Sequence, residues 1–347
     1  MKIHGLLTGC LLAGANGAMA LVPTTNVHDF GEVFIPRDAP IGSQIAQKTT
    51  GDGQSSDMTD MGKPLEHHLL IGPRLPSIVA ASADSRSQSR GEHLYDSGIP
   101  GIGIAVRHGG YLICKPNFTQ IIPNERFYPF SGVVCQLSDA QSRYNNLQAV
   151  YLVKTGEIAT GTHTINKDLY RITFDGAPFV SGSLSARVTV AGCNMPAAAP
   201  TQVNVDLGAH HQSVLSLGGA GVTPYVDFEI PLYNCTAGTY PPNMNWNYFS
   251  GNYANIKLDP ANGSTIYDAA RGILNLRPDS TAGNVGVQIL KNSTWTTPMP
   301  LGEEVRLNHV QDGTTFVPLR ARYIRLNPTV VNPGTANATA NFTVNYK

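Results

Sequence analysis

The chain has 347 residues, a formal net charge of zero and only 14% charged residues. This composition argues against a coiled coil, a helical bundle and an acidic disordered tail, and a neutral chain offers no global attraction for nucleic acid or anionic lipid. Gly and Pro are abundant, with 35 and 24 residues, and the length suits two domains of ordinary size.

The first twenty residues have the pattern of a cleavable signal peptide. Lys2 provides a positive charge, Leu6–Ala13 a short apolar core, and Ala18–Ala20 a small-x-small cleavage site. We therefore expect an exported mature chain that begins at Leu21. The alternative is a lipoprotein signal that ends at Cys10, although little apolar sequence precedes this cysteine. No later stretch of about 20 apolar residues predicts a membrane span.

The remaining chain shows the period-two alternation of β-strands, separated by clusters of turn residues, and no helical periodicity. We therefore predict an all-β protein built from sandwiches or barrels. The most distinct expected strands are Ile99–Val106, Leu147–Lys154, Leu169–Phe174, Ala186–Val190, Tyr225–Leu232 and Phe316–Leu326.

Composition also divides the chain. Thr49–Pro64 and Ala80–Glu92 are rich in Ser, Asp, Gly and Gln, and are predicted to be long surface loops. The short segment of small residues Phe179–Ser183 is predicted to be a linker. Its position predicts an N-terminal domain of residues 21–181 and a C-terminal domain of residues 182–347.

Four cysteines follow the signal peptide, and an even number in an exported protein predicts disulfide bonds. Three pairings are possible, and the two-domain interpretation favours Cys114–Cys135 together with Cys193–Cys235. The rival is a zinc site, but no two of these cysteines have the C-x2–4-C spacing of zinc ligands.

Apolar and polar residues alternate in the last expected strand, Ala340–Tyr346. Its apolar face is formed by Ala340, Phe342, Val344 and Tyr346. An amphipathic strand of this kind is an aggregation hazard at the edge of a sheet, and pairing with a strand from a partner would remove the hazard. The alternative is an ordinary strand within a complete sheet.

Several short motifs surround this strand. They are the pair Cys193 and Cys235, the strand Phe228–Cys235, the V-G-x-Q strand within Gly283–Leu290, the tripeptide Ala321–Tyr323, the segment Gly334–Ala338 and the penultimate Tyr346. Together they resemble the pilin domains of the chaperone–usher (type 1 and P-type) fimbrial family.

This resemblance implies an incomplete immunoglobulin-like sandwich that lacks its last strand, with Cys193–Cys235 as the pilin disulfide. It further implies a periplasmic chaperone that fills the resulting groove, an outer-membrane usher, and a next pilus subunit whose donor strand replaces the chaperone. The apolar face of Ala340–Tyr346 would then line the groove and pair with the donor.

The N-terminal half resembles the opening of two-domain fimbrial tip adhesins in Phe30–Ile45, which contains an Arg37-Asp38-Ala39-Pro40 turn, and in Ile99–Val106. The resemblance implies an elongated, lectin-like β-sandwich at the tip of a cell-surface fimbrium, where it binds a host glycan or surface protein. The start of the mature chain lacks a long alternating apolar stripe, so we expect a subunit that accepts a strand without donating one. The alternative is a structural or initiating tip subunit without a receptor.

Candidate sites in this half are few. No G-x-S-x-G, H-E-x-x-H or phosphate-loop pattern occurs, so no enzyme is expected. Polar and aromatic candidates for receptor binding are Tyr95, Asp96, Tyr111, Asn117 and Tyr128.

Histidines offer the one hint of a cofactor, which would be zinc. Some members of the adhesin family hold zinc through three histidines, and His67, His68 and His108 are the candidates in this chain. Adjacent His67 and His68 would point to opposite faces of a strand, so we favour a domain without a cofactor.

Overall fold

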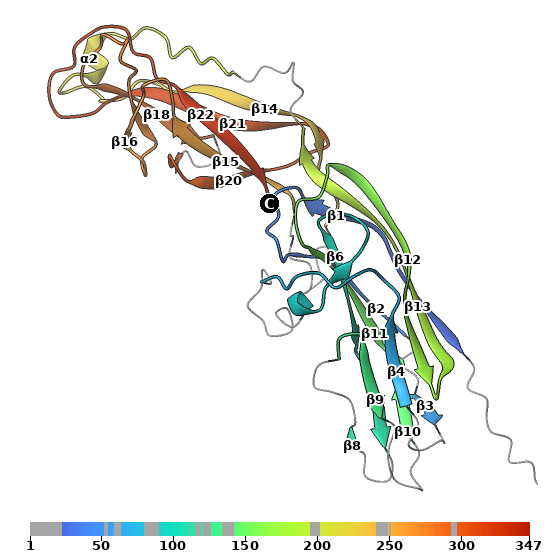
Figure 1. Ribbon diagram of the computed structural model, residues 1–347. Helices are drawn as coiled ribbons and strands as arrows, with labels where there is room; N and C mark the ends of the chain where they lie inside the picture. The colour runs from blue at the N-terminus through green and yellow to red at the C-terminus, as the bar shows by residue number, and fades with distance from the viewer. Residues whose placement is uncertain are drawn as a thin grey trace, which may run out of the picture.

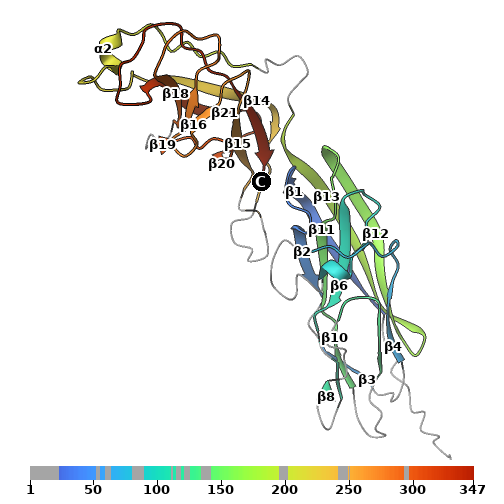
Figure 2. The ribbon, with the colours of Figure 1, turned by 60° about the vertical axis from the view of Figure 1, so that its left-hand side comes forward.

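The structure is a computed structural model in which two β-rich halves form an elongated molecule, with the C-terminus at the junction between them (Figures 1 and 2). The predicted signal peptide lies outside the residues that the structure describes. These are residues 23–51, 55–58, 64–79, 90–110, 112–114, 119–120, 126–133, 142–194, 202–240, 249, 251–292 and 297–347. Among them, no helix is long and apolar enough to cross a membrane.

Three sheets build the N-terminal half. Their strand orders are β9-β4-β12-β13 with β1 parallel to β13, β2-β11-β6-β5, and β3-β10-β7-β8. The strands are β1 Thr24–Pro36, β2 Gln44–Thr50, β3 Ser55–Met58, β4 Pro64–Leu69, β5 Tyr95–Asp96, β6 Ile102–His108, β7 Leu112–Cys114, β8 Thr119–Gln120, β9 Phe130–Val133, β10 Ser142–Asn145, β11 Gln148–Lys154, β12 Gly161–Phe174 and β13 Ala177–Cys193.

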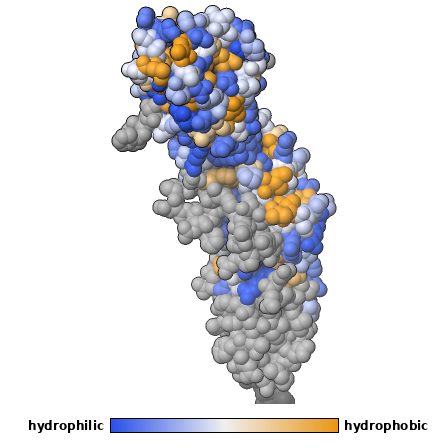
Figure 3. Space-filling model, turned by 90° about the vertical axis from the view of Figure 1, so that its left-hand side faces the viewer, coloured by the Kyte–Doolittle hydropathy of each residue, from blue (hydrophilic) through white to orange (hydrophobic). Residues whose placement is uncertain are grey.

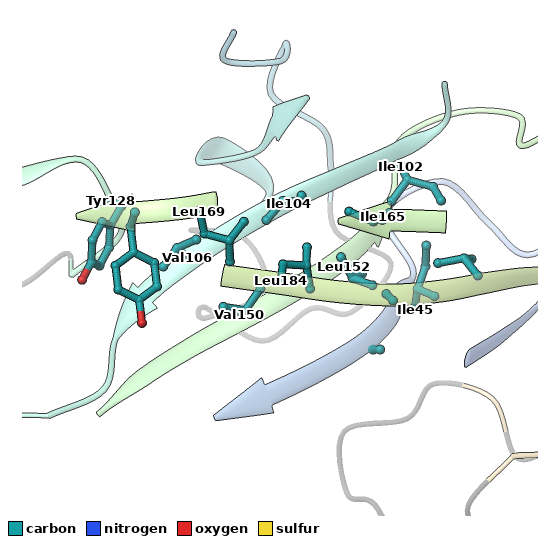
Figure 4. Packing of buried hydrophobic residues seen from close by; sticks show 14 of the residues in the cluster. Ile45, Ile102, Ile104, Val106, Tyr128, Val150, Leu152, Ile165, Leu169 and Leu184 are labelled. Carbon is teal, nitrogen blue, oxygen red and sulfur yellow. The ribbon is translucent and has the colours of Figure 1, made fainter. Parts of the chain in front are cut away.

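The core of this half lies between the first two sheets, where inward-facing apolar side chains of β6 and β11 meet those of β12 and β13. Ile104 and Leu152 come from one sheet, and Ile165 and Leu184 from the other (Figure 4). Every residue of β11 is buried because a second apolar cluster, which includes Leu94, covers the outer face of its sheet.

The C-terminal half is a sandwich of two sheets. Their orders are β16-β17-β18-β21-β14, with β19 beside β18, and β20-β15-β22. The elements are α2 Gln212–Leu215, β14 Val226–Thr236, β15 Tyr253–Pro260, β16 Ile266–Asp268, β17 Ile273–Asn275, β18 Val285–Lys291, β19 Thr297–Pro298, β20 Glu304–His309, β21 Gly313–Arg325 and β22 Ala340–Tyr346. The all-β prediction is confirmed, and the described surface mixes polar and apolar side chains (Figure 3).

The strands expected from alternation are present, often with different bounds. Leu147–Lys154 and Phe316–Leu326 nearly coincide with β11 and β21, whereas the strand expected from Ile99 begins at Ile102.

The prediction of a long loop at Thr49–Pro64 is partly wrong, because this segment contains β3, which pairs with β10.

The prediction of a linker at Phe179–Ser183 is wrong, because these residues lie inside β13. From Val180 to Ala191 this strand pairs with β1 on one side, and it pairs with β12 on the other side along most of its length. The last two residues of β13, Gly192 and Cys193, pair instead with β14 of the C-terminal half. The partner strands of β13 therefore change about ten residues later than the predicted boundary.

Candidate functional site

The strand predicted at Ala340–Tyr346 is present with these bounds as β22, and it lies at the edge of its sheet. Among the described strands its partner is β15, with pairs from Ala340↔Pro260 to Tyr346↔Ala254. Since β20 lies on the far side of β15, the other edge of β22 has no strand beside it within the described part of the chain.

The hydrogen-bond pattern shows which backbone groups face this edge. Lys347 exchanges N–H···O bonds with Tyr253 in both directions, at 3.0 and 3.2 Å. Antiparallel pairing sends the backbone groups of successive residues to opposite sides, so the odd-numbered residues of β22 face β15. The even-numbered residues point their N–H and C=O groups away from β15. We call this side the open edge, and its residues are Ala340, Phe342, Val344 and Tyr346.

The same residues carry the apolar side chains of β22. Ala340, Phe342 and Val344 pack on the C-terminal core but are only half-buried, whereas Tyr346 is fully buried. Val203 is likewise half-buried on this core, in a segment that continues to Leu207 with alternating exposure and no strand partner among the described residues. The C-terminal core is therefore incompletely covered beside β22.

A disulfide joins the two β-strands at the start of this half. Cys193 and Cys235 are bonded with an S–S distance of 2.06 Å, which confirms one of the two predicted bridges. The other predicted bridge, Cys114–Cys135, lies outside the described residues because Cys135 does.

A contact between the halves, which sequence reasoning missed, lies at the end of β22. The backbone N–H of Asp38 donates to the carbonyl oxygen of Tyr346 at 3.0 Å, and the Asp38 carboxylate accepts from the Tyr346 N–H at 2.8 Å. The Arg37 guanidinium lies 4.5 Å above the Tyr346 ring and donates to the Cys193 carbonyl at 2.9 Å. The Arg-Asp-Ala-Pro turn and the penultimate tyrosine are the sequence signals of this contact.

The three candidate zinc ligands do not converge. His67 and His68 point to opposite faces of β4, and His67 is buried beside His108, with ring centroids 5.6 Å apart. His68 is exposed, and its Nε2 lies 3.3 Å from a carboxylate oxygen of Glu66. In the described ranges, no group of three His, Cys, Asp or Glu side chains is placed to hold a metal.

A polar network is buried around His108. The Gln148 side-chain nitrogen donates to His108 Nδ1 at 2.9 Å and to the Tyr144 hydroxyl at 3.0 Å, and the Gln148 oxygen accepts from the Tyr128 hydroxyl at 2.9 Å. Tyr128 is therefore a core residue with no exposed surface (Figure 4), and its prediction as a receptor contact is wrong.

Burial keeps three core histidines neutral, because a charged imidazole is poorly solvated in the core. It is the main reason why the pKa of His28 and of His108 is lowered to about 4, and nearby Lys48 contributes to the lowered pKa of His28. Desolvation is the main reason why the pKa of His67 lies well below its ordinary value, and repulsion from His108 is the second. These side chains are therefore part of a neutral core.

Two of the remaining receptor candidates lie together. Tyr95 and Asp96 form β5 and are half-buried, and an Asp96 carboxylate oxygen accepts from the Gly98 N–H at 2.8 Å. Tyr111 and Asn117 lie outside the described residues. Receptor binding at Tyr95 and Asp96 stays a prediction.

The fold and the open edge of β22 define the C-terminal half as a β-sandwich with an incompletely covered core. Residues 181–347 match the family model described as "Fimbrial protein", so this half is a fimbrial-protein domain. The match confirms the resemblance inferred from the pilin motifs.

Several solved structures are similar to the chain. The CupB6 tip adhesin from Pseudomonas aeruginosa is 13% identical, with 89% of each chain covered and a TM-score of 0.36. The P pilus rod subunit PapA is 18% identical, with 45% of this chain and 99% of that chain covered and a TM-score of 0.33.

A chain of the CsuC–CsuE chaperone–tip adhesion subunit complex from Acinetobacter baumannii is 12% identical, with 93% of this chain and 98% of that chain covered and a TM-score of 0.24. All three TM-scores are below 0.5, so the assignment depends on the match of residues 181–347 and concerns the C-terminal half. Among curated protein sequences, none matches the chain.

Proposed function

We propose that the chain is a two-domain fimbrial tip adhesin that accepts one donor strand along the open edge of β22. The observation that carries this proposal is that Ala340, Phe342 and Val344 combine outward-facing backbone groups with half-buried apolar side chains. An added strand would satisfy the backbone groups through ladder bonds and would cover the apolar side chains. Alternation of its own apolar residues would fix its register.

The partners of this edge would follow one another during assembly. A periplasmic chaperone would supply a strand first, and the next pilus subunit would supply the permanent one after delivery to the outer-membrane usher. Both partners can use the same edge because the ladder bonds involve backbone groups that every extended segment possesses.

The N-terminal half would bind the receptor, a host glycan or surface protein. It has its own core between two sheets, separate from the apolar cluster of the C-terminal half. A second domain with a separate core is not needed for strand acceptance, and this supports a distinct role in binding.

Deletion of the gene in the producing bacterium tests the adhesive role, with pili counted by electron microscopy and attachment measured on arrays of glycans and host matrix proteins. We expect attachment to disappear while pili persist, and the intact gene to restore it. Fewer or shorter pili with unchanged attachment per pilus would instead indicate a structural or initiating tip subunit.

A further inference from the structure

Asp38 occupies the position on the open edge of β22 where an added strand would form its last pair of ladder bonds. Tyr346 directs both its N–H and its C=O toward the open edge, as the pairing of Lys347 with Tyr253 shows. Both groups are bonded to Asp38, one to its carboxylate and the other to its N–H. A single residue of the N-terminal half thus takes the place of one donor residue.

The backbone around Asp38 is fixed from several directions. The Arg37 N–H donates to the Ala191 carbonyl at 2.7 Å, and Lys154 Nζ donates to the Arg37 carbonyl at 2.8 Å. The Arg37 side chain contacts the Asp38 carboxylate at 3.3 Å and the Cys193 carbonyl at 2.9 Å. These bonds tie the turn to β11 and to the end of β13, so the position of Asp38 on the edge is set by the N-terminal half.

We propose that the Arg37-Asp38 turn is the end wall of the acceptor edge, and that Asp38 is a positioning residue that stops the donor strand at Val344. The inference extends the proposed strand acceptance and depends on it. Ladder bonds remain available at Ala340, Phe342 and Val344, which span five residues or about 17 Å of strand. Donor residues beyond Val344 meet the N-terminal half and gain no bond from β22.

The inference has a direct consequence for hydrogen exchange in the full chain without a donor. The Tyr346 amide is bonded to Asp38, whereas those of Phe342 and Val344 face the open edge. In the wild type we expect the Tyr346 amide to exchange at least tenfold more slowly than the other two. In Asp38→Ala it should exchange as fast as they do, and Asp38→Asn, which keeps an acceptor oxygen, should preserve slow exchange.

Donor length gives the functional test, with the purified full chain and synthetic peptides of alternating Thr and Val that contain 5, 7, 9 and 11 residues. The melting temperature should rise with peptide length and then reach a plateau. In the double variant Arg37→Ala/Asp38→Ala the plateau should come at a longer peptide, because the Tyr346 N–H loses the Asp38 carboxylate and becomes available to the donor. The control Glu304→Gln alters a carboxylate that binds Asn345 and Lys347 outside the open edge.

The outcomes separate the two proposals. If no peptide stabilises the wild type, the proposal of strand acceptance is wrong, and the proposal of an end wall, which depends on it, is wrong as well. If peptides stabilise wild type and double variant with the same plateau, strand acceptance stands and the end wall is wrong. A Tyr346 amide that exchanges as fast in the wild type as in Asp38→Ala also overturns the end wall, and this measurement does not depend on peptide binding.

Discussion

Gly182 shows how one residue can have opposite meanings in sequence and structure. Among small neighbours it predicts a flexible linker, but in β13 it makes room for the buried ring of Tyr170, whose Cζ would lie 2.1 Å from an added Cβ. The Tyr170 hydroxyl accepts from Asn26 and lies 3.0 Å from His28 Nε2. The ring therefore cannot move without disturbing buried hydrogen bonds.

We expect Gly182→Ala to destabilise the protein by about 1–3 kcal/mol, the usual range for overpacking a core. The matched control is Gly156→Ala, whose added Cβ would lie 3.6 Å from Gly101 Cα in ordinary contact. Urea unfolding followed by tyrosine fluorescence measures both variants. Equal stabilities of Gly182→Ala and Gly156→Ala would show that β13 does not contact Tyr170 closely.

The buried histidines predict that acid destabilises the N-terminal half. The pKa of His28 and of His108 is about 4 in the folded protein, against about 6.5 in the unfolded chain, which therefore binds more protons between these values. Stability is complete above pH 6.5 and falls as the pH drops toward 4. At pH 5 the loss is about 2 kcal/mol for each of these two histidines. Lys48 near His28, and Arg126 and Arg107 near His108, contribute to these lowered pKa values, whereas the hydrogen bond with Gln148 opposes the shift of His108.

Urea unfolding at pH 7.5 and at pH 5.0 checks this dependence. His67→Phe should reduce the difference between the two pH values, because it removes a buried histidine that stacks on Phe130 at 3.9 Å. The control His68→Gln changes the exposed neighbour on the same strand and reports on effects of substitution in β4 outside the core. Equal stability of the wild type at both pH values would contradict the neutral state of these histidines.

Strand β22 was the most predictable element, because one of its faces is apolar and the other polar. The alternation of apolar and polar residues could not define β13 in the same way. Both edges of this strand pair with neighbouring strands, and the Tyr170 ring leaves room only for glycine at position 182. The contact between Asp38 and Tyr346 could not be predicted from spacing, because 308 positions separate the two residues.

We expect Phe342→Asp to prevent strand acceptance, because a carboxylate would replace an apolar side chain on the face that the donor must cover. The matched control is Thr343→Asp, which adds the same charge to the exposed face of β22. In the peptide assay, Phe342→Asp should show no rise in melting temperature, whereas Thr343→Asp should respond like the wild type. A normal response of Phe342→Asp would place the accepting surface elsewhere.

At the scale of the whole molecule, two separate cores share one long strand. β13 contributes Leu184, Ala186 and Val188 to the N-terminal core, and its last residue, Cys193, joins the C-terminal core through the disulfide. The prediction of two domains depends on the distinct motifs of each half. The sequence could not locate the change of partner strands along β13, because a strand that continues from one sheet into another leaves no break in the pattern of residues.

The continuity of β13 predicts where the chain can be cut. A fragment of residues 21–191 should fold, because it keeps every residue of β13 that pairs with β1 or with β12. A fragment of residues 21–181, the predicted domain, loses Leu184 to Val190 from its core and leaves most of β1 without its parallel partner. Circular dichroism during heating should show a cooperative transition for the longer fragment and none for the shorter. Cooperative unfolding of both at one temperature would mean that β13 beyond residue 181 belongs to the C-terminal domain.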